Sequence, residues 1–334
     1  MINFRFHIVS LTAVLLALGV GLVLGTTFLD DATVNQLERQ LDGLEADLDR
    51  AQARNDELSG RVGSFEDEAA QLDEQIGERL FDGQLQDDPV LVVATRGVDG
   101  QWVDGVLTQL AQADADVAGV WWLTDRLVLD DDSEVADLST ALQVTTDDAD
   151  RLRHNLAVNL SDVLFGAVGA PGAGPPDAAT PAEPAEPALL ARLREAGFVE
   201  YQMPDGADAD VVVLPADGLR IVVVDGTGAS VPHGDVVLPL LTELSSGGPV
   251  SVVATQPTPQ PDDQQGDDEV VPLVTALRDS EDLKQRISTV DDLDRVAGRV
   301  ALILAAADAV PGSPVVGHYG MGDGADRLLP AAAG

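Results

Sequence analysis

The stretch that most constrains this chain is a run of 21 residues without a charge, at positions 8–28 (IVSLTAVLLALGVGLVLGTTF). As a helix, such a run is long enough to cross a hydrocarbon core of about 30 Å. A cleavable signal peptide is the alternative, but its apolar part usually has about 7–15 residues and precedes an Ala-x-Ala-like site. No such site follows here. We therefore predict an uncleaved transmembrane signal anchor over residues 1–31.

The charges on either side of this run predict its orientation. Arg5, His7 and the amino terminus precede it, whereas Asp30 and Asp31 follow it. Positive charges gather on the cytoplasmic side of a membrane helix. We therefore expect a single-pass membrane protein with a cytoplasmic N-terminus and an extracytoplasmic C-terminal domain, held in the membrane by residues 8–28.

A heptad pattern follows and predicts a coiled-coil stalk over residues 33–80. The a positions are Val34, Leu41, Leu48, Asn55, Val62, Ala69 and Ile76, and the d positions are Leu37, Leu44, Ala51, Leu58, Phe65, Leu72 and Arg79. Twelve of these fourteen are apolar, and the pattern lasts longer than the three to four heptads that indicate a coiled coil. Asn55 at a favours a parallel, in-register dimer. We expect a parallel homodimer or a higher homo-oligomer through residues 34–79; a surface helix packed on the globular part is the alternative.

The rest of the chain, residues 88–334, is predicted to be an α/β domain with a mainly parallel sheet. Short apolar runs alternate with helical stretches, and a β-α-β order implies a parallel sheet. Strands are expected at 90–95, 117–123, 211–214, 221–224 and 250–255, and helices at 102–113, 133–142, 147–165, 188–197, 236–244 and 291–307. Residues 169–187 are rich in Pro and Ala and should form an exposed loop. The domain is either continuous across this loop or divided by it into two related halves.

Composition excludes several classes of function. The 334 residues include 58 acidic and 19 basic ones, which gives a formal net charge of −39, and there is no Cys. Without Cys there is no disulfide, thiol nucleophile or Cys-ligated metal centre. Without a basic stripe, neither nucleic acid nor an anionic lipid surface is expected as a partner. Because the acidity is spread along the chain, it favours a solvated surface suited to salt over a site that attracts cations.

No catalytic motif is recognisable, so we predict that the protein is not an enzyme and has no cofactor. Residues 225–230 (DGTGAS) follow a strand, as phosphate-binding loops do, but the Gly-Lys-Ser/Thr of a P-loop is absent. We expect a turn there. Paired acids such as Asp291 and Asp292 are too frequent in this chain to indicate a glycosidase.

Residues 317–322 (GHYGMG) bring an imidazole and a thioether within three residues of each other. Both groups bind copper, and the thioether suits Cu(I). His318 and Met321 are therefore the candidate metal ligands. The alternative is a Gly-rich tail that packs Tyr319 on the core.

Taken together, these features resemble the mycobacterial copper transport protein B (MctB) family. The resemblance rests on residues 6–25 (FHIVSLTAVLLALGVGLVLG), the heptad stalk, residues 288–292 (STVDD) with Gly298 following, and residues 317–320 (GHYG). It implies a role in copper transport and homeostasis that promotes copper efflux or tolerance, with copper as the transported ion. Mycobacterial members are described as pore-forming proteins of the outer membrane, so the resemblance also points to that membrane.

The residues themselves leave two alternatives open. One is a bitopic cell-envelope scaffold whose dimeric head binds a partner or a small ligand without transport activity. The other is a solute-sensing head that binds its ligand at the C-terminal edge of a parallel sheet.

Overall fold

The structure is a computed structural model that describes residues 5–25, 50, 52, 54, 81, 83–168, 187–204, 214, 218–226, 228–246, 248–258 and 271–331. The chain divides into two units, residues 1–69 and residues 70–334. The predicted stalk lies outside the described residues, apart from three helical positions, Arg50, Gln52 and Arg54. Most of the predicted loop at 169–187 and of the predicted strand at 211–214 also lies outside them.

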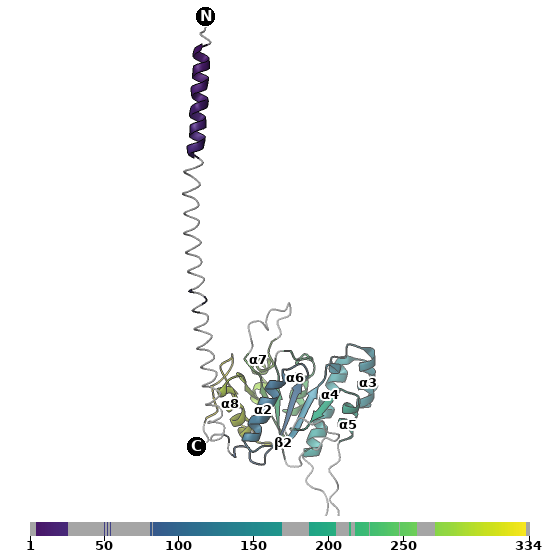
Figure 1. The fold of residues 1–334 in the computed structure, drawn as a ribbon. Coiled ribbons are helices and arrows are strands. Elements are labelled where there is room, and N and C mark those ends of the chain that lie inside the picture. The colour runs from purple at the N-terminus through teal and green to yellow at the C-terminus, as the bar shows by residue number, and fades with distance from the viewer. Residues whose placement is uncertain are drawn as a thin grey trace, which may run out of the picture. The chain divides into compact units, whose positions relative to one another are not determined.

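The first unit contains the predicted apolar helix, Arg5–Gly25, drawn in purple in Figure 1. Its 21 residues have a mean hydropathy of 2.5, and none of its most apolar stretch is buried. At 1.5 Å per residue the helix is about 30 Å long, which is the thickness of a hydrocarbon core. Among the described residues, it is the one helix with the length and composition of a membrane span.

The second unit is built on a seven-stranded sheet with the order β3-β2-β1-β4-β5-β6-β7. Its strands are β1 (Pro89–Thr95), β2 (Asp116–Leu123), β3 (Val199–Gln202), β4 (Leu219–Val224), β5 (Val250–Thr255), β6 (Ser288–Val290) and β7 (His318–Tyr319). β3 runs antiparallel to β2, and the other neighbouring strands pair in parallel. The predicted α/β domain with a mainly parallel sheet is therefore confirmed, and strands from both sides of residues 169–186 share this one sheet.

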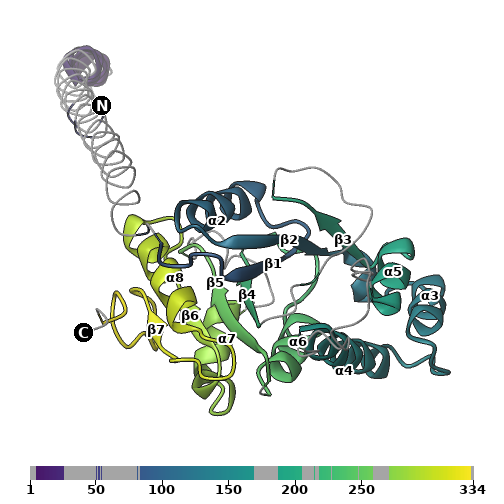
Figure 2. The same ribbon diagram turned by 90° about the horizontal axis from the view of Figure 1, so that it is seen from below.

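Helices cover both faces of the sheet, as Figure 2 shows. They are α2 (Gly100–Gln112), α3 (Asp132–Leu142), α4 (Ala149–Val168), α5 (Ala188–Glu195), α6 (Val237–Leu244), α7 (Leu273–Asp279) and α8 (Val296–Asp308), with short 3-10 turns η1 (Asp125–Val128) and η3 (Leu283–Gln285). One core lies between the sheet and α2 with α8, and the other lies beneath α3, α4, α5, α6 and α7.

The strands are almost continuously apolar because each of their faces meets a helix layer. In β1, Val90, Val92 and Ala94 point to the core on the α2 and α8 side, whereas Leu91 and Val93 point to the opposite core. This alternation follows directly from the two-residue period of a strand. Both cores can therefore be built from Val, Leu and Ala with few aromatic side chains.

The helix predicted at 291–307 was placed too early. It begins at Val296, and β6 ends immediately before Asp291. The backbone N–H of Asp291 donates to Tyr319 O at 3.1 Å, and that of Leu293 donates to Gln256 O at 3.1 Å. Asp292 has a left-handed φ of 60°, which a helix interior does not accept. Asp291 and Asp292 therefore lie at the carboxyl end of β6, close to strands on either side.

Candidate functional site

The usual ligand site of such a sheet is closed in this protein. In doubly wound sheets, ligands bind beyond the carboxyl ends of the strands, where the strand order reverses. That point lies between β1 and β4 here, and the loops that follow these two strands touch each other. The N–H of Ser230 donates to Arg96 O at 2.6 Å, and a Cβ built at Gly97 would overlap Gly228 O.

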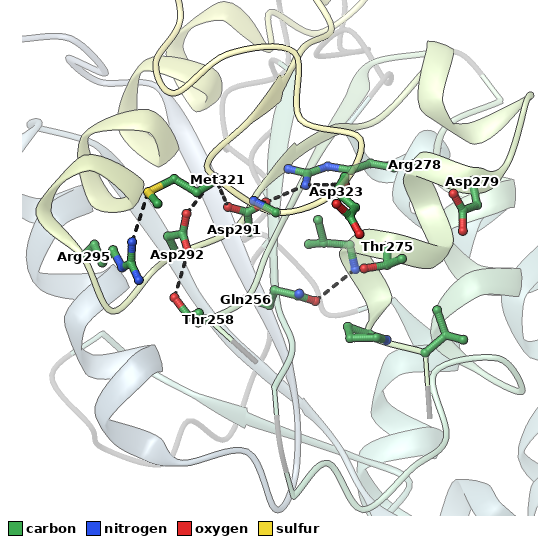
Figure 3. Close-up of a pocket in the computed structure, with 14 residues that line it drawn as sticks. Gln256, Thr258, Thr275, Arg278, Asp279, Asp291, Asp292, Arg295, Met321 and Asp323 are labelled. Atoms are coloured by element: carbon green, nitrogen blue, oxygen red, sulfur yellow. Dashed lines mark hydrogen bonds and ion pairs between the residues drawn. The ribbon is translucent and has the colours of Figure 1, made fainter. Parts of the chain in front are cut away.

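A cavity of about 560 Å³ lies farther along the same edge, beyond the carboxyl ends of β5 and β6 (Figure 3). Its lining residues are Gln256, Thr258, Val271, Pro272, Val274, Thr275, Arg278, Asp279, Asp291, Asp292, Arg295, Met321, Gly322 and Asp323. The volume lies within the usual range of small-molecule pockets, about 300–1,000 Å³. The lining combines apolar side chains with several charged ones, which makes this cavity the candidate site.

One wall of the cavity is a buried ion pair. Arg278 of α7 and Asp291 lie 2.5 Å apart, and the side chains are 3% and 4% exposed. Arg278 Nε donates to Thr289 Oγ1 at 2.9 Å, and Nη2 donates to Tyr319 O at 2.8 Å. A buried ion pair is stable only when its remaining donors find acceptors. Arg278 meets that condition, because its Nε and both terminal nitrogens donate to groups of the protein itself.

Asp291 and Asp292 hold the main chain that follows β7. The N–H of Met321 donates to Asp291 Oδ1 and to Asp292 Oδ2, each at 2.8 Å. Gly322 N–H donates to Asp291 Oδ2 at 3.1 Å, and Thr258 Oγ1 donates to Asp292 Oδ1 at 2.8 Å. We call this pair of carboxyl groups the aspartate pair.

The two members of the aspartate pair titrate differently. Burial raises the pKa of Asp291, and its hydrogen bond with Asp292 raises it further, although Arg278 opposes both effects. Burial also acts to raise the pKa of Asp292, but hydrogen bonds from Asp291, Thr258 and Met321 outweigh it and lower that pKa. The pKa values of neighbouring carboxyl groups move apart in this way because two close negative charges repel each other, so one group loses its proton more readily than the other. Asp292 therefore keeps its charge more readily than Asp291.

Two glycines make room for the aspartate pair. Gly320 has a φ of +122°, and a Cβ built there would overlap Asp291 Oδ1. A Cβ built at Gly298 would overlap Asp292 O. Both glycines belong to the short strings on which the family resemblance rests, and the close approach of the aspartates gives a physical reason for them.

The two predicted metal ligands lie in different environments, His318 buried and Met321 exposed. His318 is 9% exposed. Its Nε2 lies 3.0 Å from Lys284 O and must donate to it, so Nδ1 accepts from Thr289 Oγ1 at 2.9 Å. Burial lowers the pKa of His318, which agrees with a neutral ring. A metal ion would have to displace one of these two bonds.

Met321 is 65% exposed and lines the cavity. Its sulfur accepts from Arg295 Nη1 at 3.0 Å. Tyr319 is buried against the core on the α2 and α8 side, as the alternative for this tail predicts. In the part of the chain that the structure describes, no group of three or more His, Asp or Glu side chains could hold a metal ion. Ligation by His318 and Met321 stays a prediction.

Comparison with known proteins decides the family. The profile described as "Copper transport outer membrane protein, MctB" matches residues 1–330. The chain belongs to the MctB family. Proteins named "Copper transporter MctB" from Mycobacterium tuberculosis (strain H37Rv) and Mycobacterium bovis are each 29% identical over 341 residues, which covers 97% of this chain and 98% of theirs. The protein of that name from Mycobacterium leprae is 28% identical over 354 residues, which covers 98% and 99%.

The structure also explains why two of the MctB-like strings occur together. Residues 288–290 form β6, and β7 pairs with them in parallel, Thr289 opposite His318 and Val290 opposite Tyr319. The aspartate pair follows one strand and Gly320 follows the other. Sequence reasoning did not single out Arg278 or Gln256 as site residues, because neither lies in one of these strings.

Proposed function

We propose that this chain is a membrane-anchored protein of copper transport and homeostasis that promotes copper efflux or tolerance. The match of the MctB profile to residues 1–330 carries the proposal, and relatives that cover 97% of the chain are named copper transporters. The apolar helix Arg5–Gly25 supports the membrane anchor. The family description names an outer membrane, which is the alternative to the cytoplasmic membrane for this anchor.

The proposal includes a topology and a subunit arrangement. With the anchor in the cytoplasmic membrane, the N-terminus is cytoplasmic and the α/β head is extracytoplasmic, because Arg5 and His7 precede the uncharged run at 8–28. Two or more chains associate in parallel through the heptads at 34–79, since anchors in one membrane project their stalks the same way. A second candidate function is a ligand-binding head without transport, which the cavity of about 560 Å³ favours.

Deletion of the gene is expected to raise the copper content of cells and their sensitivity to copper. Copper and zinc measured together by mass spectrometry test this, with zinc as the control metal. The full chain should restore normal copper content, and a Met321→Leu chain should restore it less well if this thioether handles Cu(I). Copper content that is unchanged by the deletion would contradict copper transport. Full restoration by Met321→Leu would contradict only the role of the thioether.

Replacing Asn55 with Leu is expected to change the oligomeric state or the register of the stalk. A single Asn at an a position favours a parallel dimer, and Leu there removes that preference. Light scattering of the detergent-solubilised chain, corrected for bound detergent, gives the subunit number. A monomeric parent chain, or an Asn55→Leu chain with the same subunit number and register, would contradict the parallel-dimer proposal.

A further inference from the structure

The cavity at the carboxyl ends of β5 and β6 is lined by Gln256, whose amide has one donor without an acceptor among the described residues. Gln256 is 4% exposed, and its Oε1 accepts from the N–H of Val274 at 3.0 Å. Because a backbone N–H must face an acceptor, this contact fixes the orientation of the amide and directs Nε2 elsewhere. Among the described residues, Nε2 has no hydrogen-bond partner. Figure 3 shows this side chain in the middle of the pocket-lining residues.

The Nε2 atom is not itself sealed from solvent: it opens onto the cavity, where water or a ligand oxygen can accept from it. A small ligand that brings an acceptor oxygen into the cavity can replace water as the partner of this donor. Among the described residues the point between β1 and β4 is closed, and this cavity lies at the same carboxyl edge of the sheet, which is where ligands of such folds bind.

The charges around Gln256 indicate a positive group on the same ligand. Arg278 is neutralised by Asp291, and Arg295 donates to the sulfur of Met321. Asp279 and Asp323 also line the cavity. Neither carboxylate forms an ion pair with any residue that the structure describes. Two carboxylates without a counter-charge beside a neutral donor favour a cation that also carries an acceptor.

The remaining wall is apolar. Val271 is 45% exposed, and it lines the cavity together with Pro272 and Val274. Pockets for small molecules typically combine such a wall with a few polar groups that fix the orientation of the ligand. An aliphatic group on the ligand would bury this surface.

We propose that the cavity binds a small primary amine with a neighbouring carbonyl or carboxyl oxygen, which is the chemistry of an amino acid or its amide. The ammonium group lies against Asp279 and Asp323, the oxygen accepts from Gln256 Nε2, and an aliphatic side chain lies on Val271. The proposal does not depend on copper transport. The test of this proposal is binding of a ligand to the purified chain, whereas the test of copper transport is the copper content of cells. Either proposal can therefore fail while the other holds.

Titration calorimetry of the full chain in detergent tests this with L-leucinamide as the probe. Two analogues remove one feature each: 4-methylpentanamide lacks the amine, and 3-methylbutylamine lacks the carbonyl. We expect L-leucinamide to bind and each analogue to bind at least about tenfold more weakly, because each leaves a pocket group unmatched. No binding of L-leucinamide at millimolar concentration, or equal binding of all three compounds, overturns the proposal.

Three variants locate the binding. Gln256→Glu removes the free donor but keeps an oxygen for Val274 N–H, and Asp323→Asn removes one carboxylate from an exposed position. Asp104→Asn makes the same charge change on the exposed side of α2, away from the cavity, and is the matched control. We expect the first two to weaken L-leucinamide binding about tenfold and the control to leave it unchanged. Unchanged binding in Asp323→Asn and in a folded Gln256→Glu chain places the probe elsewhere and overturns the proposal.

Discussion

Replacing Asp291 with Leu is expected to lower the free energy of unfolding of the head by about 3–5 kcal/mol, because it leaves the buried Arg278 guanidinium without its counter-charge. Both side chains of this pair are almost fully buried. The variant also removes the carboxylate that accepts from the N–H groups of Met321 and Gly322. These donors sit in the segment that closes one side of the cavity, so the loss affects the pocket as well as the core.

Urea unfolding of the full chain in detergent, followed by tryptophan fluorescence, measures this change. The three tryptophans are Trp102, Trp121 and Trp122, and all belong to the unit of residues 70–334. The signal therefore reports on the head and not on the membrane helix. The transition must be two-state for the free energies to be compared.

Two further variants make the test specific to the buried pair. Replacing both partners, as Arg278→Met with Asp291→Leu, should recover much of the lost stability, since apolar replacement of a whole buried pair is often neutral. Asp282→Leu breaks an exposed pair with Arg286 and should cost less than about 1 kcal/mol. A double variant that loses as much as the sum of its two single variants would contradict the proposed role of the pair.

The fold could be predicted from the sequence because its signals are local. The apolar run at 8–28 and the Val-rich strands carry their periodicity within a few residues, and buried parallel strands are continuously apolar. The strands β6 and β7 have only three and two residues, too few for a period to show. The antiparallel β3, at four residues, was missed for the same reason.

The candidate site could not be predicted because its parts meet only in the folded chain. Asp291 contacts Arg278, which lies 13 residues earlier, and Met321, which lies 30 residues later. Leu293 has helical spacing with Val296 and Val300, so the pattern wrongly extended α8 back over the aspartate pair. The backbone bond of Leu293 to Gln256 O, made across the sheet, overrides that spacing. Long-range hydrogen bonds of this kind leave no periodic signal in a single sequence.

Replacing Gly320 with Ala is expected to destabilise the head by about 3–5 kcal/mol, which combines backbone strain with overpacking. The φ of Gly320 is +122°, a conformation that residues with a Cβ rarely adopt. The added methyl group would also overlap Asp291 Oδ1. Asp291 cannot simply move aside, because Arg278 and the N–H of Met321 hold its carboxylate.

Gly312→Ala is the matched control for this variant. Gly312 also has a positive φ, +81°, but nothing lies within 4 Å of a Cβ built there. Its replacement should therefore cost only the backbone strain, about 1–2 kcal/mol. The difference between the two variants measures the steric contact with Asp291, and Gly320→Ala combined with Asp291→Ala, which removes the overlapping oxygen, should cost less than the sum of the two single changes. Equal losses of unfolding free energy at Gly320 and Gly312 would show that Gly320 is required only for its backbone conformation, and that the close approach of Asp291 does not require a glycine there.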